Sequence, residues 1–349
     1  RASAAASAAT GAGAPLQGSF VEDFSACVGG KPSGVDWNIP LTQWGGNVNG
    51  GVNPANVACV PDADAGKTVL RLTTTGDLYN DTAGPFGVLK DGSPRPDDAL
   101  FRGWAYSTYS HAHPCVSHTT PPRCNVRRVG GAITSKAVFG PGGTHLQFRM
   151  KPCKEFGVVS TVYLYNYTEH YCDTSSSACA PAYQAQCCGG QPCTDSNDVC
   201  EGTWIENLEI DVELPTSDTS VQPRAIDPQW ITFHNARFSS YTALPSATHV
   251  KCGSDSPCSQ EKYFTVPAEQ NDGKYHTYDV WWDTRDASLG GNVTYAVDGE
   301  VVATITGANK VPAGPMHLYL AAWVPNSWAG SPLFDTCDLL VDYVRIDPM

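Results

Sequence analysis

One short stretch combines three acidic residues at a spacing that would suit catalysis. Residues 204–215 read WIENLEIDVELP, and within them acidic and aliphatic residues alternate: Glu209, Ile210, Asp211, Val212, Glu213 and Leu214. Strict alternation is the period of a β-strand, so we expect the acids on one face and the aliphatic residues on the other. Carboxylates in a row repel one another. The pattern therefore indicates either an acidic surface strand or a site that uses the acids.

The spacing of the two glutamates points to a particular chemistry. Glu209 and Glu213 are four residues apart, so their Cα atoms lie roughly 13 Å apart in a strand. If each side chain leans inward by about 3.5–4 Å, the carboxyl groups end about 5–6 Å apart. Retaining glycosidases need about 5–5.5 Å between their carboxyl groups, whereas inverting enzymes need about 6.5–9.5 Å. One Glu would be the nucleophile and the other the acid/base, with Asp211 holding the nucleophile.

The Glu-x-Asp-x-Glu run, with Trp204 five positions before its first Glu, resembles glycoside hydrolase family 16. That family includes lichenases, laminarinases, xyloglucan transglycosylases and fungal cell-wall crosslinking enzymes. The resemblance implies that Glu209 is the nucleophile, Asp211 the assisting acid and Glu213 the general acid/base. The short, unbulged run is similar to the lichenase and transglycosylase branches, whereas Trp204 is similar to the laminarinase side.

The same resemblance implies residues that contact sugar, on strands and loops bordering a cleft. They are Trp204, Tyr165, His234, Asn235, Trp323 and Trp328, with Tyr163 near them. Flat indole rings bind the apolar faces of sugars and keep an N–H for their hydroxyls. Each also has a simpler interpretation, as a strand aromatic, a structural histidine or a core tryptophan. The core interpretation suits Trp281 and Trp282 better than Trp328.

The strands that would position these residues are short, and turn signals recur between them. Alternating patterns predict strands such as Val69–Thr74, Phe156–Tyr167 and Gln229–Phe238, and no helical period persists. We predict an all-β jelly-roll sandwich of two antiparallel sheets, one concave and carrying the acids. Residues 18–349 would form a single domain after a low-complexity tail at 1–17, with disulfide-stapled loop insertions at about 76–127 and 168–203.

The 14 cysteines predict an oxidising compartment and up to seven disulfides, one of them between Cys27 and Cys59. Cys115 lies among histidines, so a metal site is an alternative to a disulfide with Cys124. Residues 168–203 hold six cysteines, for which we expect a stapled loop rather than a zinc knuckle. Such a loop would overhang the cleft and could set substrate length or block access.

Several features predict a secreted or cell-surface glycoprotein. Three Asn-x-Thr sequons occur, at Asn80, Asn166 and Asn292. The formal charge of −13 argues against nucleic acid as a partner. No apolar run approaches about 18 residues, so we expect no membrane span. The Ala/Ser-rich tail at 1–17 is a candidate for self-assembly or for contact with a partner protein.

The predicted function is that of a secreted, endo-acting, retaining β-glucan hydrolase or transglycosylase that needs no cofactor for catalysis. The resemblance further implies a structural calcium with Asp342 as a ligand, since calcium takes oxygen ligands. Two other interpretations remain open. A structural extracellular glycoprotein would keep the fold for assembly, and a carbohydrate-binding module would need the aromatic residues without the acids.

Overall fold

The computed structural model describes residues 15–42, 44, 51–76, 78–79, 84, 128–172, 202–215, 235–242, 259–265, 270–286, 290–307, 311–325 and 332–349. In these ranges the chain forms β-strands and one short 3₁₀ helix, η1 (Pro54–Asn56). No helix in this part of the chain is long and apolar enough to cross a membrane. The described residues include the strand that contains the acidic stretch and the strands that pair with it.

The first sheet, sheet A, has the strand order β14-β13-β12-β7-β16-β5-β4, and β1 pairs with β16. Its strands are β1 (Phe20–Glu22), β4 (Val57–Asp62), β5 (Lys67–Thr75), β7 (Thr144–Lys151), β12 (His276–Asp283), β13 (Asn292–Val297), β14 (Glu300–Thr306) and β16 (Thr336–Pro348). Every pairing in sheet A is antiparallel.

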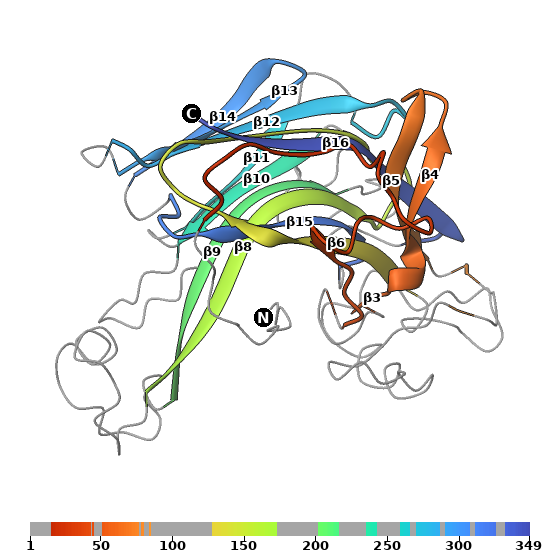
Figure 1. The fold of residues 1–349 in the computed structure, drawn as a ribbon, viewed down its shortest axis with the longest axis horizontal. Helices are drawn as coiled ribbons and strands as arrows, with labels where there is room; N and C mark the ends of the chain where they lie inside the picture. The colour runs from red at the N-terminus through yellow and green to blue at the C-terminus, as the bar shows by residue number, and fades with distance from the viewer. Residues whose placement is uncertain are drawn as a thin grey trace, which may run out of the picture.

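The second sheet, sheet B, has the order β11-β10-β9-β8-β15-β6-β2. Its strands are β2 (Trp37–Asn38), β3 (Gly51–Val52), β6 (Val129–Phe139), β8 (Val159–Cys172), β9 (Gly202–Pro215), β10 (Asn235–Thr242), β11 (Ser259–Thr265) and β15 (Met316–Trp323). All pairs are antiparallel except the short parallel pair of β3 with β6. The predicted sandwich of two antiparallel sheets is confirmed (Figure 1).

The chain often changes sheet between consecutive strands. The Gly-Pro-Gly-Gly turn after β6 carries the chain from sheet B to β7 in sheet A, so it joins the two layers rather than closing a hairpin. Gly142 and Gly143 have φ angles of 108° and 103°, a region that glycine adopts without steric cost.

The core lies between the sheets and is built by alternate residues of both. Its largest fully buried side chains include Trp37, Trp282, Tyr278, Tyr295 and Phe148. Trp282 is thus a core residue. Trp281 is not, because neighbouring residues of a strand face opposite ways. Its ring lies on the outer face of sheet A and stacks on that of His145, with the ring centroids 4.9 Å apart.

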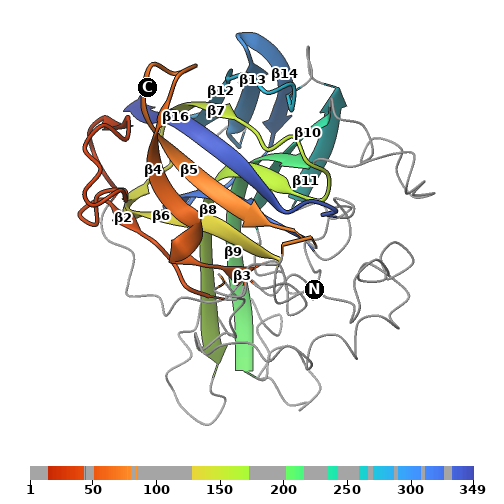
Figure 2. The same cartoon turned by 90° about the vertical axis from the view of Figure 1, so that its right-hand side faces the viewer.

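Two predicted boundaries change. The register of β8 with β9 continues without a break to the pair Cys172↔Gly202, so residues 168–172 and 202–203 are strand. Both views show β8 and β9 running past the rest of sheet B (Figures 1 and 2). The predicted insertion at 168–203 therefore begins as an extended hairpin. Its two strands remain paired through backbone hydrogen bonds, which do not depend on the side-chain pattern. Residues 173–201 lie outside the described part.

The other predicted segments are described only in part. Residues 229–234 of the strand predicted at Gln229–Phe238 lie outside the described ranges, and β10 begins at Asn235. Most of the predicted insertion at 76–127 also lies outside them. At the end of the predicted tail, the backbone N–H of Leu16 donates to the carbonyl of Val138 at 2.9 Å, so this end contacts its own domain. The division into a tail and one domain stays a prediction.

The β13–β14 hairpin has the geometry that its Asp298-Gly299 turn predicts. Both residues have positive φ, 51° and 83°, as a type I′ turn requires. The carboxylate of Asp298 accepts the backbone N–H of Thr277 at 2.9 Å and lies 2.7 Å from Nδ1 of His276. These contacts stabilise the aspartate in a backbone region that side chains seldom adopt.

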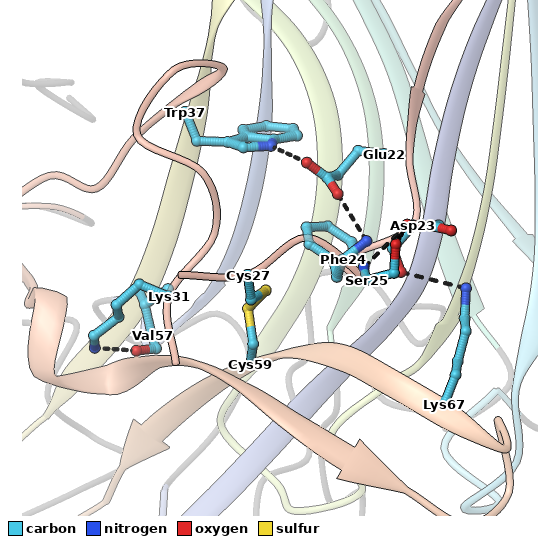
Figure 3. The surroundings of a disulfide bond; sticks show 10 residues. All are labelled: Glu22, Asp23, Phe24, Ser25, Cys27, Lys31, Trp37, Val57, Cys59 and Lys67. Carbon is cyan, nitrogen blue, oxygen red and sulfur yellow. Dashed lines mark hydrogen bonds between the residues drawn. A yellow bond between two sulfur atoms is a disulfide. The ribbon is translucent and has the colours of Figure 1, made fainter. Parts of the chain in front are cut away.

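Two disulfides lie within the described ranges. Cys27–Cys59 is confirmed as predicted and ties the segment after β1 to β4 (Figure 3). Cys153–Cys337 joins the β7–β8 connection to the start of β16, and it is buried in a small cluster with Val158 and Phe334. The remaining cysteines lie outside the described side chains.

We expect the Cys153–Cys337 bridge to contribute more to stability than Cys27–Cys59. Replacing both Cys153 and Cys337 with alanine should lower the free energy of unfolding by about 3–5 kcal/mol, because the bridge closes a far longer loop in the unfolded chain. The bridged residues are 184 positions apart, against 32 for Cys27–Cys59. Denaturant unfolding of both double variants without reductant measures this. Equal losses of unfolding free energy in the two double variants would contradict the expectation.

Candidate active site

Strand β9 places the three acids on one face. Ile210, Val212 and Leu214 are 1%, 1% and 3% exposed in the core between the sheets. Because side chains alternate along a strand, the acids lie on the opposite face of sheet B, here called the open face. The alternation predicted from the sequence is confirmed.

The acids differ in burial. Glu209 and Glu213 are half-buried, whereas Asp211 between them is only 3% exposed. The register of β9 with β8 and with β10 has no shift through the acids, so the run is unbulged, as its sequence indicates. Two accessible carboxyl groups thus flank an enclosed one.

The neighbouring strand β8 faces the acids with uncharged side chains. Tyr165 pairs with Glu209, Tyr163 with Asp211, and Thr161 with Glu213. Residues directly opposite in an antiparallel pair share a face, with Cβ atoms about 4.5–5.5 Å apart. On the other side, β10 brings Tyr241, Ser239 and Arg237 to the register positions of the same three acids.

The hydroxyl of Tyr163 remains neutral beside the acids. Burial raises the pKa of Tyr163 well above its usual value, and the nearby Tyr319, Glu209 and Asp211 raise it further. Burial likewise raises the pKa of Tyr319 to about 12. Neither phenol carries a charge near neutral pH, so both add hydrogen-bonding capacity to the site without adding a negative charge.

An aromatic cluster adjoins the acids on the open face. Tyr163 and Tyr319 stack at 4.9 Å with ring planes 17° apart, and Tyr165 meets their edges at 6.1 and 5.8 Å. Trp44 packs over the pair, 6.4 Å from Tyr163 and 6.1 Å from Tyr319. All four rings are partly exposed, so the cluster presents apolar surface next to polar hydroxyls, as sugar-binding sites do.

Trp323 belongs to the same region. It pairs with Val159 at the end of β15, and together with Trp44 it packs against a small buried cluster of Val52, Ala132 and Ala321. The structure therefore gathers two of the predicted sugar contacts, Tyr165 and Trp323, on the sheet that carries the acids.

The other predicted sugar contacts are not placed as side chains. Trp204 lies in β9, and Asn235 is the first residue of β10, but their side chains lie outside the described part. His234 and Trp328 lie outside the described residues altogether. The catalytic and sugar-binding roles therefore stay predictions.

The predicted sequons and metal residue lie elsewhere. Asn166 is in β8, where it pairs with the buried Leu208, and Asn292 begins β13; Asn80 lies outside the described residues. Asp342 is in β16 of sheet A, where its carboxylate forms ion pairs with Lys67 and Arg149. Two cations at this carboxylate do not fit a calcium site. Among the described residues no group of three or more His, Cys, Asp or Glu is placed to hold a metal.

Residues 226–343 match the family described as glycosyl hydrolases family 16. The predicted resemblance to this family is confirmed over these residues. The matched segment begins after Glu213, so it covers β10 to β16 without the acids themselves. No curated protein matches the chain.

The chain is similar in fold to solved glucanases along most of its length. It is similar to a prokaryotic beta-1,3-1,4-glucanase (lichenase) derived from a mouse hindgut metagenome, at 17% identity and a TM-score of 0.50 over 95% of this chain and 100% of that one. It is also similar to a glycoside hydrolase family 16 endo-glucanase from Bacteroides ovatus, at 15% identity and 0.51 over 94% and 99%. A laminarinase catalytic domain from Thermotoga petrophila matches at 13% and 0.50 over 94% and 95%.

Sequence reasoning missed two members of the aromatic cluster. Tyr319 has a signal, because it alternates with the buried Leu318 and Leu320 in β15. Trp44 has none, since it lies between β2 and β3 in a segment without periodicity, and only the fold brings it onto Tyr163 and Tyr319.

We expect that Asp211→Asn raises stability while it lowers activity. The substitution replaces the middle carboxyl group of the row, which is almost fully buried between two other acids, with a neutral amide. The free energy of unfolding should rise by up to about 1 kcal/mol. Thermal unfolding of the parent and the variant checks the sign, with Asp338→Asn, an exposed acid of β16, as the control. A loss of stability would show that Asp211 is needed structurally.

Proposed function

We propose that the chain is a secreted, endo-acting, retaining β-glucan hydrolase or transglycosylase, with Glu209 as the nucleophile and Glu213 as the acid/base. The proposal rests on the row of two half-buried glutamates that flank a buried aspartate. This row lies beside an aromatic cluster on the open face of sheet B. The family match supports the reaction class. The two disulfides support an oxidising compartment.

A neutral β-glucan suits the site as substrate. The aromatic rings offer apolar surface for sugar faces, and the hydroxyls of Tyr163 and Tyr319 stay neutral donors. The solved relatives are described as a beta-1,3-1,4-glucanase and an endo-1,3-beta-glucanase. A glucan chain would cross β9 and extend over β8 and β15, so that one glycosidic bond lies between Glu209 and Glu213.

In the first step the carboxylate of Glu209 attacks the anomeric carbon of the sugar. The bond from that carbon to the glycosidic oxygen breaks, and the carboxylic proton of Glu213 moves to the leaving oxygen. The product is an ester between Glu209 and the sugar, with Glu213 now a carboxylate. Asp211, enclosed between the two, would hold the carboxyl group of Glu209 for this attack.

In the second step the carboxylate of Glu213 accepts a proton from water or from a hydroxyl of another sugar chain. That oxygen bonds to the anomeric carbon, and the ester to Glu209 breaks. Two inversions give net retention. Water as the acceptor gives hydrolysis, and a sugar hydroxyl gives transglycosylation, so the outcome depends on how well an acceptor sugar competes with water.

Replacing the nucleophile tests the proposal. Glu209→Gln keeps the shape of the side chain but removes its nucleophilic oxygen, so turnover of laminarin, mixed-linkage glucan or xyloglucan should fall by roughly a thousandfold or more, while oligosaccharide binding persists. The matched control is Glu300→Gln, which changes an exposed glutamate in β14 and should leave turnover unchanged. Reducing-end release and NMR of the product anomer are the measurements, with labelled acceptors present to detect transfer.

An unchanged rate in Glu209→Gln would remove Glu209 from the nucleophile role. If the parent neither cleaves nor transfers any of the three glucans, the structural-glycoprotein interpretation becomes the better one. An inverted product anomer would contradict the retaining mechanism.

Trp44 should contribute to glucan binding rather than to the chemical step. Trp44→Ala removes the ring that packs over Tyr163 and Tyr319, so oligosaccharide affinity should fall about three- to tenfold, with kcat at saturation little changed. Trp281→Ala is the matched control, because its indole lies on the outer face of sheet A. Calorimetric titration with laminari- and mixed-linkage oligosaccharides measures both. Equal affinity in the two variants would show that Trp44 lies outside the sugar path.

A further inference from the structure

Asp342 occupies an irregular position in sheet A. The register of β16 with β7 shifts between Val341 and Tyr343, so Asp342 is the extra residue of a β-bulge, a feature that re-aims a side chain. The residue is 5% exposed. A carboxylate with so little access to water needs a compensating charge.

Two cations from the flanking strands supply that charge. Nζ of Lys67, at the start of β5, lies 2.7 Å from Oδ1 of Asp342, and Nη1 of Arg149, from β7, pairs with Oδ2. About a third of each cationic side chain is exposed, against 7% for the side chain of Asp342. Both carboxylate oxygens therefore have a protein cation within ion-pair distance, although Oδ1 accepts no hydrogen bond.

The ammonium of Lys67 has a second oxygen neighbour. It lies 3.4 Å from the backbone carbonyl oxygen of Asp23, in the segment after β1, as Figure 3 shows. Lys67 thus lies between a carboxylate oxygen and a backbone carbonyl oxygen. These are the two kinds of protein donor that calcium takes, and an ammonium is a compact cation that can use them as well.

We propose that the ammonium of Lys67 takes the place of the structural calcium that the family resemblance implies at Asp342. The fold then carries its own cation at this position and gains no stability from calcium. Lys67 and Arg149 would both repel a divalent ion placed beside them. The bulge therefore does not bind a metal ion while Lys67 is present.

Further cations and carboxylates lie near Asp342. Lys151, next along β7, pairs with Asp62 at 3.3 Å and with Asp64 at 2.7 Å. Arg149 and Lys151 both lie over the ring of Tyr275, at 4.6 and 4.9 Å. Burial, followed by the charge of Asp62, raises the pKa of Tyr275, so its phenol adds no negative charge. Lys67, Arg149 and Lys151 thus lie near the carboxylates of Asp342, Asp62 and Asp64, and the carboxylate of Asp23 also lies near Lys67.

Thermal unfolding of the full chain tests the proposal, and it does not depend on catalytic activity. The parent is compared in chelator and in millimolar calcium chloride, and its two melting temperatures should agree within about 1 °C. Lys67→Ala should melt roughly 2–5 °C lower in chelator, because Asp342 loses a partner. Calcium should recover part of that loss, since the substitution leaves a vacant position next to the carboxylate oxygen.

The matched control is Lys274→Ala, which removes another lysine paired with an aspartate, Asp272 at 2.7 Å, where the lysine is well exposed. It should lose little stability and show no response to calcium. A parent that melts lower in chelator than in calcium would overturn the proposal, and so would a Lys67→Ala variant that calcium does not stabilise. If Lys67→Ala does not fold, terbium luminescence on the parent decides, since a bound ion at Asp342 would contradict the proposal.

Discussion

The alternation of β9 is the constraint on which the candidate site depends. Ile210, Val212 and Leu214 must face sheet A to complete the core, and a strand that buries every second residue presents the others together on its opposite face. A slip of one residue in register would bury three carboxylates and expose three aliphatic side chains. The packing energy of the sandwich therefore fixes the direction of the acids.

Carboxylates have different neighbours in the two sheets of the sandwich. In sheet A, Asp342 has Lys67 and Arg149 within ion-pair distance, and such pairing holds a carboxylate in one position. In sheet B the neighbours from β8 are Tyr165, Tyr163 and Thr161, which can hydrogen-bond to an acid without neutralising it. A carboxylate that must bond to carbon, or release and regain a proton, needs the second kind of environment. The contrast separates a stabilising use of acids from a chemical one.

Much of the fold and the row of acids could be predicted because they follow from local pattern. The period of residues 204–215, the Asp298-Gly299 turn and the Cys27–Cys59 bridge depend on residues close in sequence or on simple chemistry. What could not be predicted depends on pairing between distant segments. Trp44 reaches Tyr163 and Tyr319 only because η1 and β3 pack against β6, and Lys67 reaches Asp342 only because β5 lies beside a bulged β16. Neither contact has a periodic signal.

The extended β8–β9 hairpin connects these observations to substrate choice. Its two strands carry the acids and Tyr165 near one end, and they stay paired as far as Cys172 and Gly202. The hairpin therefore continues sheet B beyond Glu209 as two paired strands rather than as an ordinary connection. Under the proposed function, a glucan that crosses β9 would have this hairpin on one side and the cluster of Trp44 and Tyr319 across the sheet. The strands that would limit the shape of the substrate are strands that the core itself holds in place, so specificity and stability would share the same backbone.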